Sequence, residues 1–251
     1  MGDDNYKRFE RLTFDDFRRL ATDDSLSRHE KIGFPDSYRE GKEAAIFEDI
    51  RTKLRNLDGT AKTVLDVGPG CSQLPLMLID LCRRNGHNLI MVDSEEMLSQ
   101  LPAEPFMKKI AAYYPHCETL FEEFTGKVDV ILSYSVLHYI FAESNVWDFL
   151  DQSLMLLSPG GEMLIGDVPN VSKRKRFFSS AAGIKFHQEF MQTEELPNVE
   201  FNRVERNQID DSVVLSLLTR ARHQGFDAYV LPQAGGLSME NRREDILIRR
   251  P

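Results

Sequence analysis

The sequence has few cysteines, no long apolar stretch and too few basic residues to balance its acidic ones. The three cysteines, Cys71, Cys82 and Cys117, are odd in number and widely spaced. They predict reduced thiols in a cytoplasmic protein, not a disulfide framework or a zinc site. No run of about 18 or more apolar residues occurs, so we expect no membrane span. The charged segment 1–17 lacks the apolar core of a secretory signal.

Charge and length narrow the class of protein further. Lysine and arginine total 31 against 40 aspartates and glutamates, which gives a formal net charge of −9 at pH 7. Proteins that bind nucleic acid are usually basic, so the bulk charge makes nucleic acid an unlikely partner. The 251 residues suffice for one α/β domain with a full core. No metal-ligand cluster stands out in the sequence, so we predict no catalytic metal.

The chain divides at residue 62 into two regions of different periodicity. Residues 1–62 are predicted to form an N-terminal helical extension. Within it, Thr13 precedes two acids and is typical of a helix start. A second helix is expected to begin near Ser37 and to have one apolar face. That face contains Ile46, Phe47, Ile50, Leu54 and Leu57.

Residues 63–251 are predicted to form one α/β domain in which short apolar strands alternate with helices. The expected strands are 63–67, 88–92, 118–121, 128–133, 162–166, 228–231 and 245–248. Such alternation is typical of a parallel sheet with helices on both faces. The last two strands are joined without a helix and should pair antiparallel. We therefore predict a doubly wound, Rossmann-like, seven-stranded sheet with one antiparallel strand.

The segment VLDVGPG at 64–70 is the strongest functional signal. A buried strand carries Asp66 and runs into a glycine turn before a helix, and ligands bind beyond the carboxyl end of such a strand. Gly68 and Gly70 match the first two glycines of a dinucleotide fingerprint, but Gln73 replaces the third. Asp66 also suits a ligand that bears an ammonium and a sulfonium better than it suits a pyrophosphate.

The ends of two further strands contribute to the same edge of the predicted sheet. Asp93 ends the second strand and is placed to accept hydrogen bonds from ribose hydroxyls, which all nucleotide cofactors require. Met97 either packs against an adenine ring or is a core methionine. The fourth strand ends at Ser133 and Tyr134, which should face the same cleft.

Together these motifs resemble those of the class I S-adenosylmethionine-dependent methyltransferases. The resemblance rests on LDVGPG, IMVD, DVILSYSVLHY and LLSPGGEMLI, in this order, across residues 63–167. It implies the sheet order 3-2-1-4-5-7-6 and S-adenosylmethionine as cofactor. Ser72 stands where the family often has a third glycine, and the adenine-contacting acid is left open between Glu122 and Glu123. The cofactor-binding residues predicted on this basis are Asp66, Gly68, Pro69, Gly70, Asp93, Ser94, Met97, Ser133 and Tyr134.

The acceptor side is predicted from histidines and cations. His138 follows the fourth strand where the cleft opens, so it is either the catalytic base or a structural histidine at a helix start. The run 173–176 contains four cations and follows the fifth strand at the same sheet edge. It predicts either an anion site or a solvated helix start. The predicted substrate-binding residues are His29, Tyr38, Arg39, Lys173, Arg174, Arg176 and His187.

We therefore expect O-methylation of a small anionic acceptor, such as a phosphorylated or nucleotide-linked sugar. The N-terminal stretch and the ending RREDILIRR look similar to methyltransferases encoded with bacterial surface-polysaccharide pathways. The alternatives are an RNA or protein methyltransferase, a non-catalytic S-adenosylmethionine-binding protein and a nicotinamide dehydrogenase. The sequence leaves a homodimer open.

Overall fold

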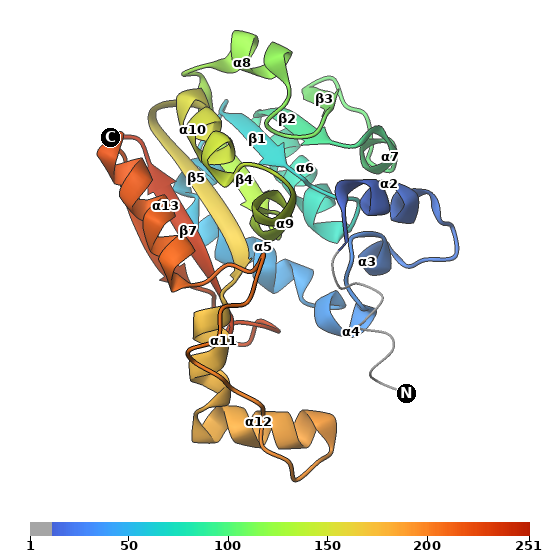
Figure 1. The fold of residues 1–251 in the computed structure, drawn as a ribbon. Coiled ribbons are helices and arrows are strands. Elements are labelled where there is room, and N and C mark those ends of the chain that lie inside the picture. Colours follow the sequence, from blue (N-terminus) through green and yellow to red (C-terminus); the bar gives the residue numbers. More distant parts are fainter. Residues whose placement is uncertain (1–11) are drawn as a thin grey trace.

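A seven-stranded sheet forms the centre of the computed structural model, which describes residues 12–251 (Figure 1). Its strands are β1 (Thr63–Val67), β2 (Asn88–Asp93), β3 (Met107–Ala111), β4 (Val128–Tyr134), β5 (Leu157–Pro169), β6 (Asp227–Pro232) and β7 (Arg243–Arg249). They lie in the order β3-β2-β1-β4-β5-β7-β6. β1 to β5 pair in parallel, and β7 runs antiparallel to both of its neighbours. The predicted order and the single antiparallel strand are confirmed.

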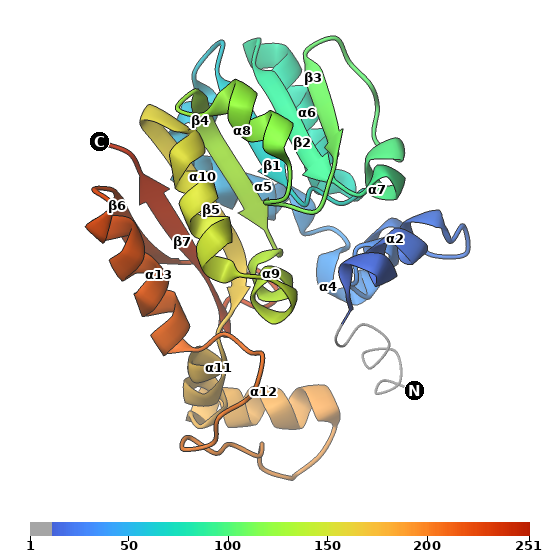
Figure 2. The same cartoon turned by 45° about the horizontal axis from the view of Figure 1, so that its top comes forward.

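Helices cover both faces of the sheet (Figures 1 and 2). One face packs against α8 (Glu118–Phe124), α9 (Leu137–Glu143), α10 (Val146–Leu156) and α13 (Asp211–His223). The other packs against α5 (Glu43–Lys53) and α6 (Gln73–Asn85). Along β1, Leu65 and Val67 face the first layer and Val64 faces the second. Side chains alternate along a strand, so a strand covered on both faces is apolar throughout.

The N-terminal extension contains more helices than its periodicity predicts. Thr13 caps α2 (Phe14–Thr22) through a capping box with Asp16, which confirms the predicted helix start. The apolar face expected after Ser37 is buried, but one continuous helix was wrong. Gly41, with φ +72°, separates the short helix α4 (Asp36–Arg39) from α5. The described part of the extension, from residue 12, also contains α3 (Arg28–Lys31) and the 3-10 turn Arg55–Asp58.

The third strand lies at a different place from the one predicted. Residues 118–121 begin α8, and β3 is formed by 107–111 instead. β3 is an edge strand that includes Lys108 and Lys109, so it lacks the apolar run by which a buried strand is recognised. Lys109 Nζ donates to two main-chain carbonyls at 2.8 and 2.7 Å, at the end of α7 (Glu95–Ser99).

The segment after β5 leaves the sheet as an arm, which consists of α11 (Val171–Phe178) and α12 (Ala181–Met191) (Figures 1 and 2). Asn170 caps α11 by accepting from the amides of Ser172 and Lys173. Within residues 12–251, no helix is both long and apolar enough to cross a bilayer.

The core interpretation predicts a contrast between two positions on α10. Phe149 is fully buried, whereas Met155 is 51% exposed. Phe149→Ala should lower the free energy of unfolding by about 3–5 kcal/mol, because it removes a ring and leaves a cavity. That corresponds to a fall in Tm of roughly 6–20 °C by calorimetry. Met155→Ala is the matched control, and an equal fall in both variants would contradict the assigned core.

Candidate functional site

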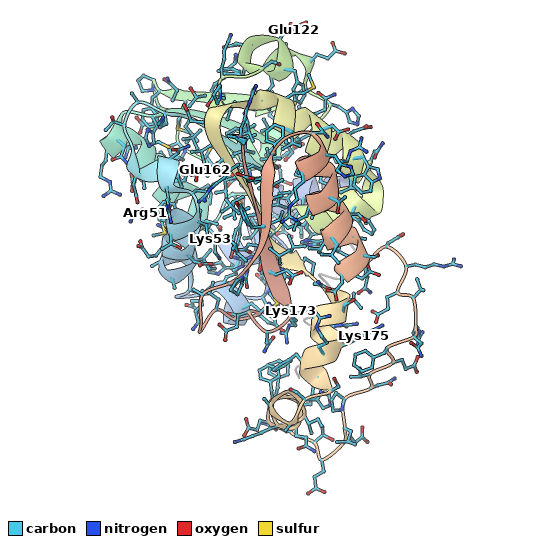
Figure 3. All side chains as sticks on the ribbon, turned by 90° about the vertical axis from the view of Figure 1, so that its left-hand side faces the viewer. Arg51, Lys53, Glu122, Glu162, Lys173 and Lys175 are labelled. Carbon is cyan, nitrogen blue, oxygen red and sulfur yellow. The ribbon has the colours of Figure 1, made fainter. Side chains whose placement is uncertain are left out.

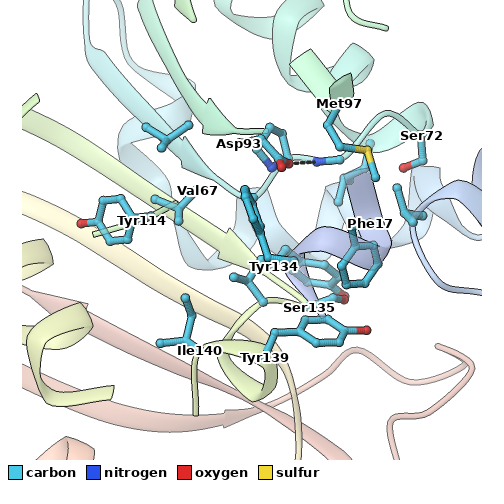
Figure 4. A pocket seen from close by; sticks show the side chains of 18 of the residues that line it. Phe17, Val67, Ser72, Asp93, Met97, Tyr114, Tyr134, Ser135, Tyr139 and Ile140 are labelled. Atoms are coloured by element: carbon cyan, nitrogen blue, oxygen red, sulfur yellow. Dashed lines mark hydrogen bonds between the residues drawn. The ribbon is translucent and has the colours of Figure 1, made fainter. Parts of the chain in front are cut away.

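A cavity lies at the carboxyl ends of β1, β2 and β4 (Figure 4). Gly68, Pro69 and Gly70 line it from the loop after β1, and Asp93 lines it from the end of β2. The N-terminal extension closes the opposite wall. The lining residues of that wall are Phe14, Phe17, His29, Ile32, Phe34, Arg39, Glu43 and Ile46. The space that these residues surround, including the open solvent at its mouth, amounts to about 1040 Å³.

The two loop glycines are required by conformation and by space. Gly68 and Gly70 have φ +68° and +64°, a region that disfavours residues with a Cβ. A Cβ on Gly68 would lie 2.6 Å from Val136 Cγ2, and one on Gly70 would lie 2.6 Å from Ile32 Cγ2. The loop backbone therefore approaches both the chain after β4 and the N-terminal extension as closely as sterics permit.

Asp93 is held in a fixed orientation beside this loop (Figure 4). Its Oδ2 accepts from the amide of Gly70 at 3.0 Å and its Oδ1 from the amide of Ser94 at 2.7 Å. Burial raises the pKa of Asp93 to about 6, so the carboxylate is still ionised at neutral pH. Two anchored oxygens with lone pairs to spare suit the paired hydroxyls of a ribose.

The cavity brings together most of the predicted cofactor-binding residues. Those that line it are Gly68, Pro69, Gly70, Asp93, Met97 and Tyr134. Asp66, Ser94 and Ser133 lie outside the lining formed by the described part of the chain. Ser94 instead caps α7 by accepting from the amide of Met97 at 3.2 Å. Asp66 is buried, and burial followed by the charge of Asp93 raises its pKa to about 8.

The predicted residues of the extension divide between the cavity and its surroundings. His29 and Arg39 line the cavity. Tyr38 does not belong to that lining, and its carbonyl accepts from a hydroxyl of the β6–β7 loop at 2.8 Å. His29 Nδ1 lies 2.8 Å from Asp36 Oδ1, and its Nε2 contacts Glu43. Both ring nitrogens are thus engaged by carboxylates, so His29 is unsuited to accept a proton from a substrate.

His138 lies next to the cavity lining and not within it. Its ring packs against Tyr139, which does line the cavity, with 4.0 Å between the centroids. Burial, with a smaller effect of nearby Arg243, lowers the pKa of His138 to about 3. Its Nδ1 is buried and finds no hydrogen-bond partner in residues 12–251. An imidazole with so low a pKa takes up a proton poorly at neutral pH.

The basic run lies on α11 and is engaged within the chain (Figure 3). Lys173 Nζ donates to a main-chain carbonyl of β7 at 2.6 Å. Arg174 and Arg176 form ion pairs with Glu205 and Asp211. With His187, Arg174 lines a separate hollow on the arm. The structure therefore does not bring this run or His187 to the cavity, and acids that are distant in the sequence pair with Arg174, Lys175 and Arg176.

A buried charge cluster at the ends of β4 and β5 escaped the sequence analysis, apart from Arg39. Arg39 Nη2 donates to Ser135 Oγ at 2.6 Å and to Asp167 Oδ2 at 2.9 Å. Ser135 in turn donates to Asp167, and Arg243 Nη1 lies 2.6 Å from the same oxygen of Asp167. Ser135 follows β4 directly and Asp167 lies near the end of β5, but the partners lie too far apart in the chain for any spacing rule to pair them.

Aromatic rings join the extension to the body of the protein across the cavity. Phe14 meets Tyr113 edge-on at 4.9 Å between centroids, and Phe17 meets Tyr139 in the same way at 4.8 Å. All four residues line the cavity. Because edge-to-face pairs are favourable beyond their buried area, they help to hold α2 over the site and to keep water out.

No protein-family model matches this sequence, and no curated protein matches it either. The comparison with solved structures, in contrast, finds many related folds.

The N-methyltransferase NodS from Bradyrhizobium japonicum WM9, solved with S-adenosyl-L-homocysteine, has a TM-score of 0.59 and 14% identity, over 96% of this chain and 100% of that one. The plantazolicin methyltransferase BpumL, solved with the same compound, has a TM-score of 0.54 and 16% identity, over 98% and 97%. The CurJ carbon methyltransferase has a TM-score of 0.56 and 15% identity, over 86% of this chain and 57% of that chain. At these identities the likeness establishes the fold, which is that of the class I S-adenosylmethionine-dependent methyltransferases.

The raised pKa of Asp66 predicts a pH-dependent effect on stability. Well below the ordinary aspartate pKa of 3.8, its carboxyl is protonated in the folded and the unfolded chain alike, so ionisation costs nothing. As the pH rises toward 8, the unfolded chain ionises first, and the folded state loses stability. Asp66→Asn, which cannot ionise, should therefore raise Tm at pH 8 by roughly 3–10 °C and change it little at pH 4.

The control for this comparison is Asp148→Asn, because Asp148 is exposed on α10. It should shift Tm little at either pH. A stabilisation by Asp66→Asn that is equal at pH 4 and pH 8 would show that ionisation of Asp66 is not its source.

Proposed function

We propose that this protein is an S-adenosylmethionine-dependent methyltransferase that acts on a small molecule. One observation carries the proposal. The loop glycines at 68 and 70 and the anchored carboxylate of Asp93 line one cavity, at the switch point of a sheet with this fold. Asp93 would hold the ribose, the loop backbone would hold the amino-acid part of the cofactor, and Met97 would pack beside the adenine.

The same geometry disfavours a dinucleotide. The amide of Gly70, which a pyrophosphate would need, already donates to Asp93. The sheet also departs from the dinucleotide-binding order 3-2-1-4-5-6, because β7 is inserted antiparallel between β5 and β6.

The chemistry points to an acceptor oxygen that is already anionic. In the transfer, the acceptor oxygen bonds to the methyl carbon while the carbon–sulfur bond breaks, and the electron pair remains on sulfur, which becomes neutral. A hydroxyl acceptor would need a base, and His29 and His138 are both unsuited to that role. A carboxylate or phosphate oxygen needs none. We therefore propose O-methylation of such a group, in a cavity whose aromatic walls align the reactants and exclude water.

Replacement of a loop glycine tests the cofactor site. Gly70→Ala should weaken binding of S-adenosylhomocysteine by at least about tenfold in isothermal titration, because the new Cβ displaces Ile32 and strains the loop. Gly86→Ala is the matched control. Gly86 has nearly the same φ, +66°, but nothing lies within 4 Å of an added Cβ.

Both alanine variants should lose about 1 kcal/mol of stability from the left-handed conformation. Binding should change in the Gly70 variant alone. If the unaltered protein binds NAD and ignores S-adenosylhomocysteine, the proposed function is wrong.

The pKa of Asp93 predicts how cofactor binding depends on pH. An ionised carboxylate accepts from ribose hydroxyls, and a protonated one accepts less well. Affinity for S-adenosylhomocysteine should therefore fall as the pH drops through about 6. Asp93→Asn should bind about tenfold more weakly and lose this pH dependence, since an amide does not titrate in this range. Titrations from pH 5 to 8 check both points, and parallel pH profiles for the two proteins would exclude Asp93 as the titrating group.

A further inference from the structure

We infer that Arg39 is the centre of an oxyanion-binding subsite in the cavity, and that this subsite takes a carboxylate or phosphate group of the methyl acceptor. The inference rests on the proposed function and deepens it, because it concerns the molecule that shares the cavity with the cofactor. Arg39 ends α4, lines the cavity, and has a side chain that is only 8% exposed.

Two guanidinium groups share a single carboxylate oxygen at this position. Arg39 and Arg243 both donate to Asp167 Oδ2, at 2.9 and 2.6 Å. One carboxylate balances one of the two positive charges. The cluster at the cavity wall therefore carries a positive charge that its own carboxylate leaves uncompensated.

The compensating negative charge lies behind this cluster, away from the cavity. Asp245 Oδ1 accepts from the amide of Asp167 at 2.8 Å, and Lys53 Nζ lies 2.6 Å from both Asp245 Oδ2 and Asp49 Oδ2. This second group holds two carboxylates and one ammonium, and none of its three members lines the cavity. The buried network is thus neutral as a whole but polarised, and Arg39, from its positive half, lines the cavity.

Arg39 also retains hydrogen-bonding capacity. Its Nη2 is used by Ser135 and Asp167, but its Nε is buried and has no acceptor among residues 12–251. A buried donor without a partner costs about 1–3 kcal/mol. An oxyanion that is seated against the guanidinium and accepts from Nε would relieve that cost.

The guanidinium is held rigidly in this position. It lies 4.2 Å from the ring centroid of Phe34 and 5.5 Å from that of Tyr134. Ser135 and Asp167 hold its Nη2 from adjacent strand ends, and both have φ in the left-handed region, +63° and +57°. Such conformations are costly for residues with a Cβ and concentrate at functional sites, where surrounding contacts enforce them. A donor fixed in advance binds an anion with little further loss of entropy.

The position of Arg39 separates it from the cofactor end of the cavity. Asp93, the proposed ribose ligand, ends β2, whereas Arg39 is bound at the ends of β4 and β5. In the sheet, β1 lies between β2 and β4. Arg39 therefore lies nearer to the part of the cavity that is left for the methyl acceptor.

Other cavity carboxylates do not serve as counter-ions for Arg39. Glu43 contacts His29, and Asp93 is bound by the amides of Gly70 and Ser94. Glu143 accepts from a main-chain amide of α2 at 3.2 Å. Each is engaged elsewhere, so the charge of Arg39 remains available to a ligand.

The test uses two aromatic oxyanions, phenyl phosphate and benzoate, with benzyl alcohol as the neutral probe. Each is titrated into the full-length protein saturated with S-adenosylhomocysteine, and binding is followed by ligand-observed NMR. We expect at least one anion to bind more tightly than benzyl alcohol, and Arg39→Met to weaken that anion by about 10- to 100-fold, the range for a charge-assisted hydrogen bond. Arg220→Met is the control, because Arg220 pairs with Asp151 on the outer surface, and it should leave anion binding unchanged.

The anion at Arg39 could belong to the methyl acceptor or to the carboxylate of the cofactor. To separate these two sources, the affinity of Arg39→Met is measured for S-adenosylhomocysteine and for 5′-methylthioadenosine, which lacks the amino-acid group. Both affinities should stay within about threefold of those of the unaltered protein. If Arg39 bound the cofactor by a charge-assisted hydrogen bond, its loss would weaken cofactor binding by more than threefold. Selective loss of S-adenosylhomocysteine binding would assign Arg39 to the cofactor carboxylate and overturn the inference. The inference would also be overturned if neither anion bound more tightly than benzyl alcohol. If the unaltered protein does not bind S-adenosylhomocysteine at all, the proposed function itself has failed.

Arg39→Lys guards against loss of folding in the methionine variant. It keeps the charge but lacks the planar fork, so anion binding should weaken by about two- to tenfold while Tm changes little. Anion affinity that is the same in Arg39→Lys, Arg39→Met and the unaltered protein would rule out a role for this side chain.

Discussion

The arrangement of the cavity depends on the carboxylate of Asp167, on which two arginines from distant parts of the chain converge. Arg39 belongs to the N-terminal extension and Arg243 to β7, and both side chains donate to Asp167. A buried charge is tolerated only when it is paired, and removal of one partner typically costs about 3–5 kcal/mol. The pairing therefore binds the extension to the carboxyl edge of the sheet, and it completes the cavity that neither part encloses alone.

The two ends of the cavity differ in the chemical groups that line them. At one end, main-chain amides of a glycine loop anchor Asp93, which is a rigid and polar arrangement suited to the hydroxyls of a nucleoside. At the other end, aromatic rings and Arg39 face the space between the extension and β4. This division of chemistry fits a nucleoside cofactor beside a compact anionic acceptor. The polar groups of each end are oriented before any ligand enters, which lowers the entropic cost of binding.

The glycine loop and Asp93 were predictable from sequence because each depends on local rules, whereas the sheet order followed only from the resemblance to the methyltransferase family. A positive φ calls for glycine, and strand ends at a switch point share one edge. The basic run at 173–176 was a weaker guide, since four cations in a row do not reveal the distant acids, Glu205 and Asp211, that pair with Arg174 and Arg176. His138 is a candidate base in the sequence because it follows the end of β4 by a few residues. The helical turn after β4 leaves Tyr139 in the cavity lining and His138 beside it.

The sequence by itself determined the class of fold, the place of the glycine loop and the helix start at Thr13, because periodicity, capping and turn chemistry act over a few residues. The tertiary structure alone decided which charges face the cavity. Arg39 reaches Ser135 across 96 residues and Asp167 across 128, and Arg243 reaches the same oxygen of Asp167 across 76. Electrostatic pairing and burial depend on distance in space, so no pattern along the chain specifies which cation finds a partner and which remains to receive a ligand.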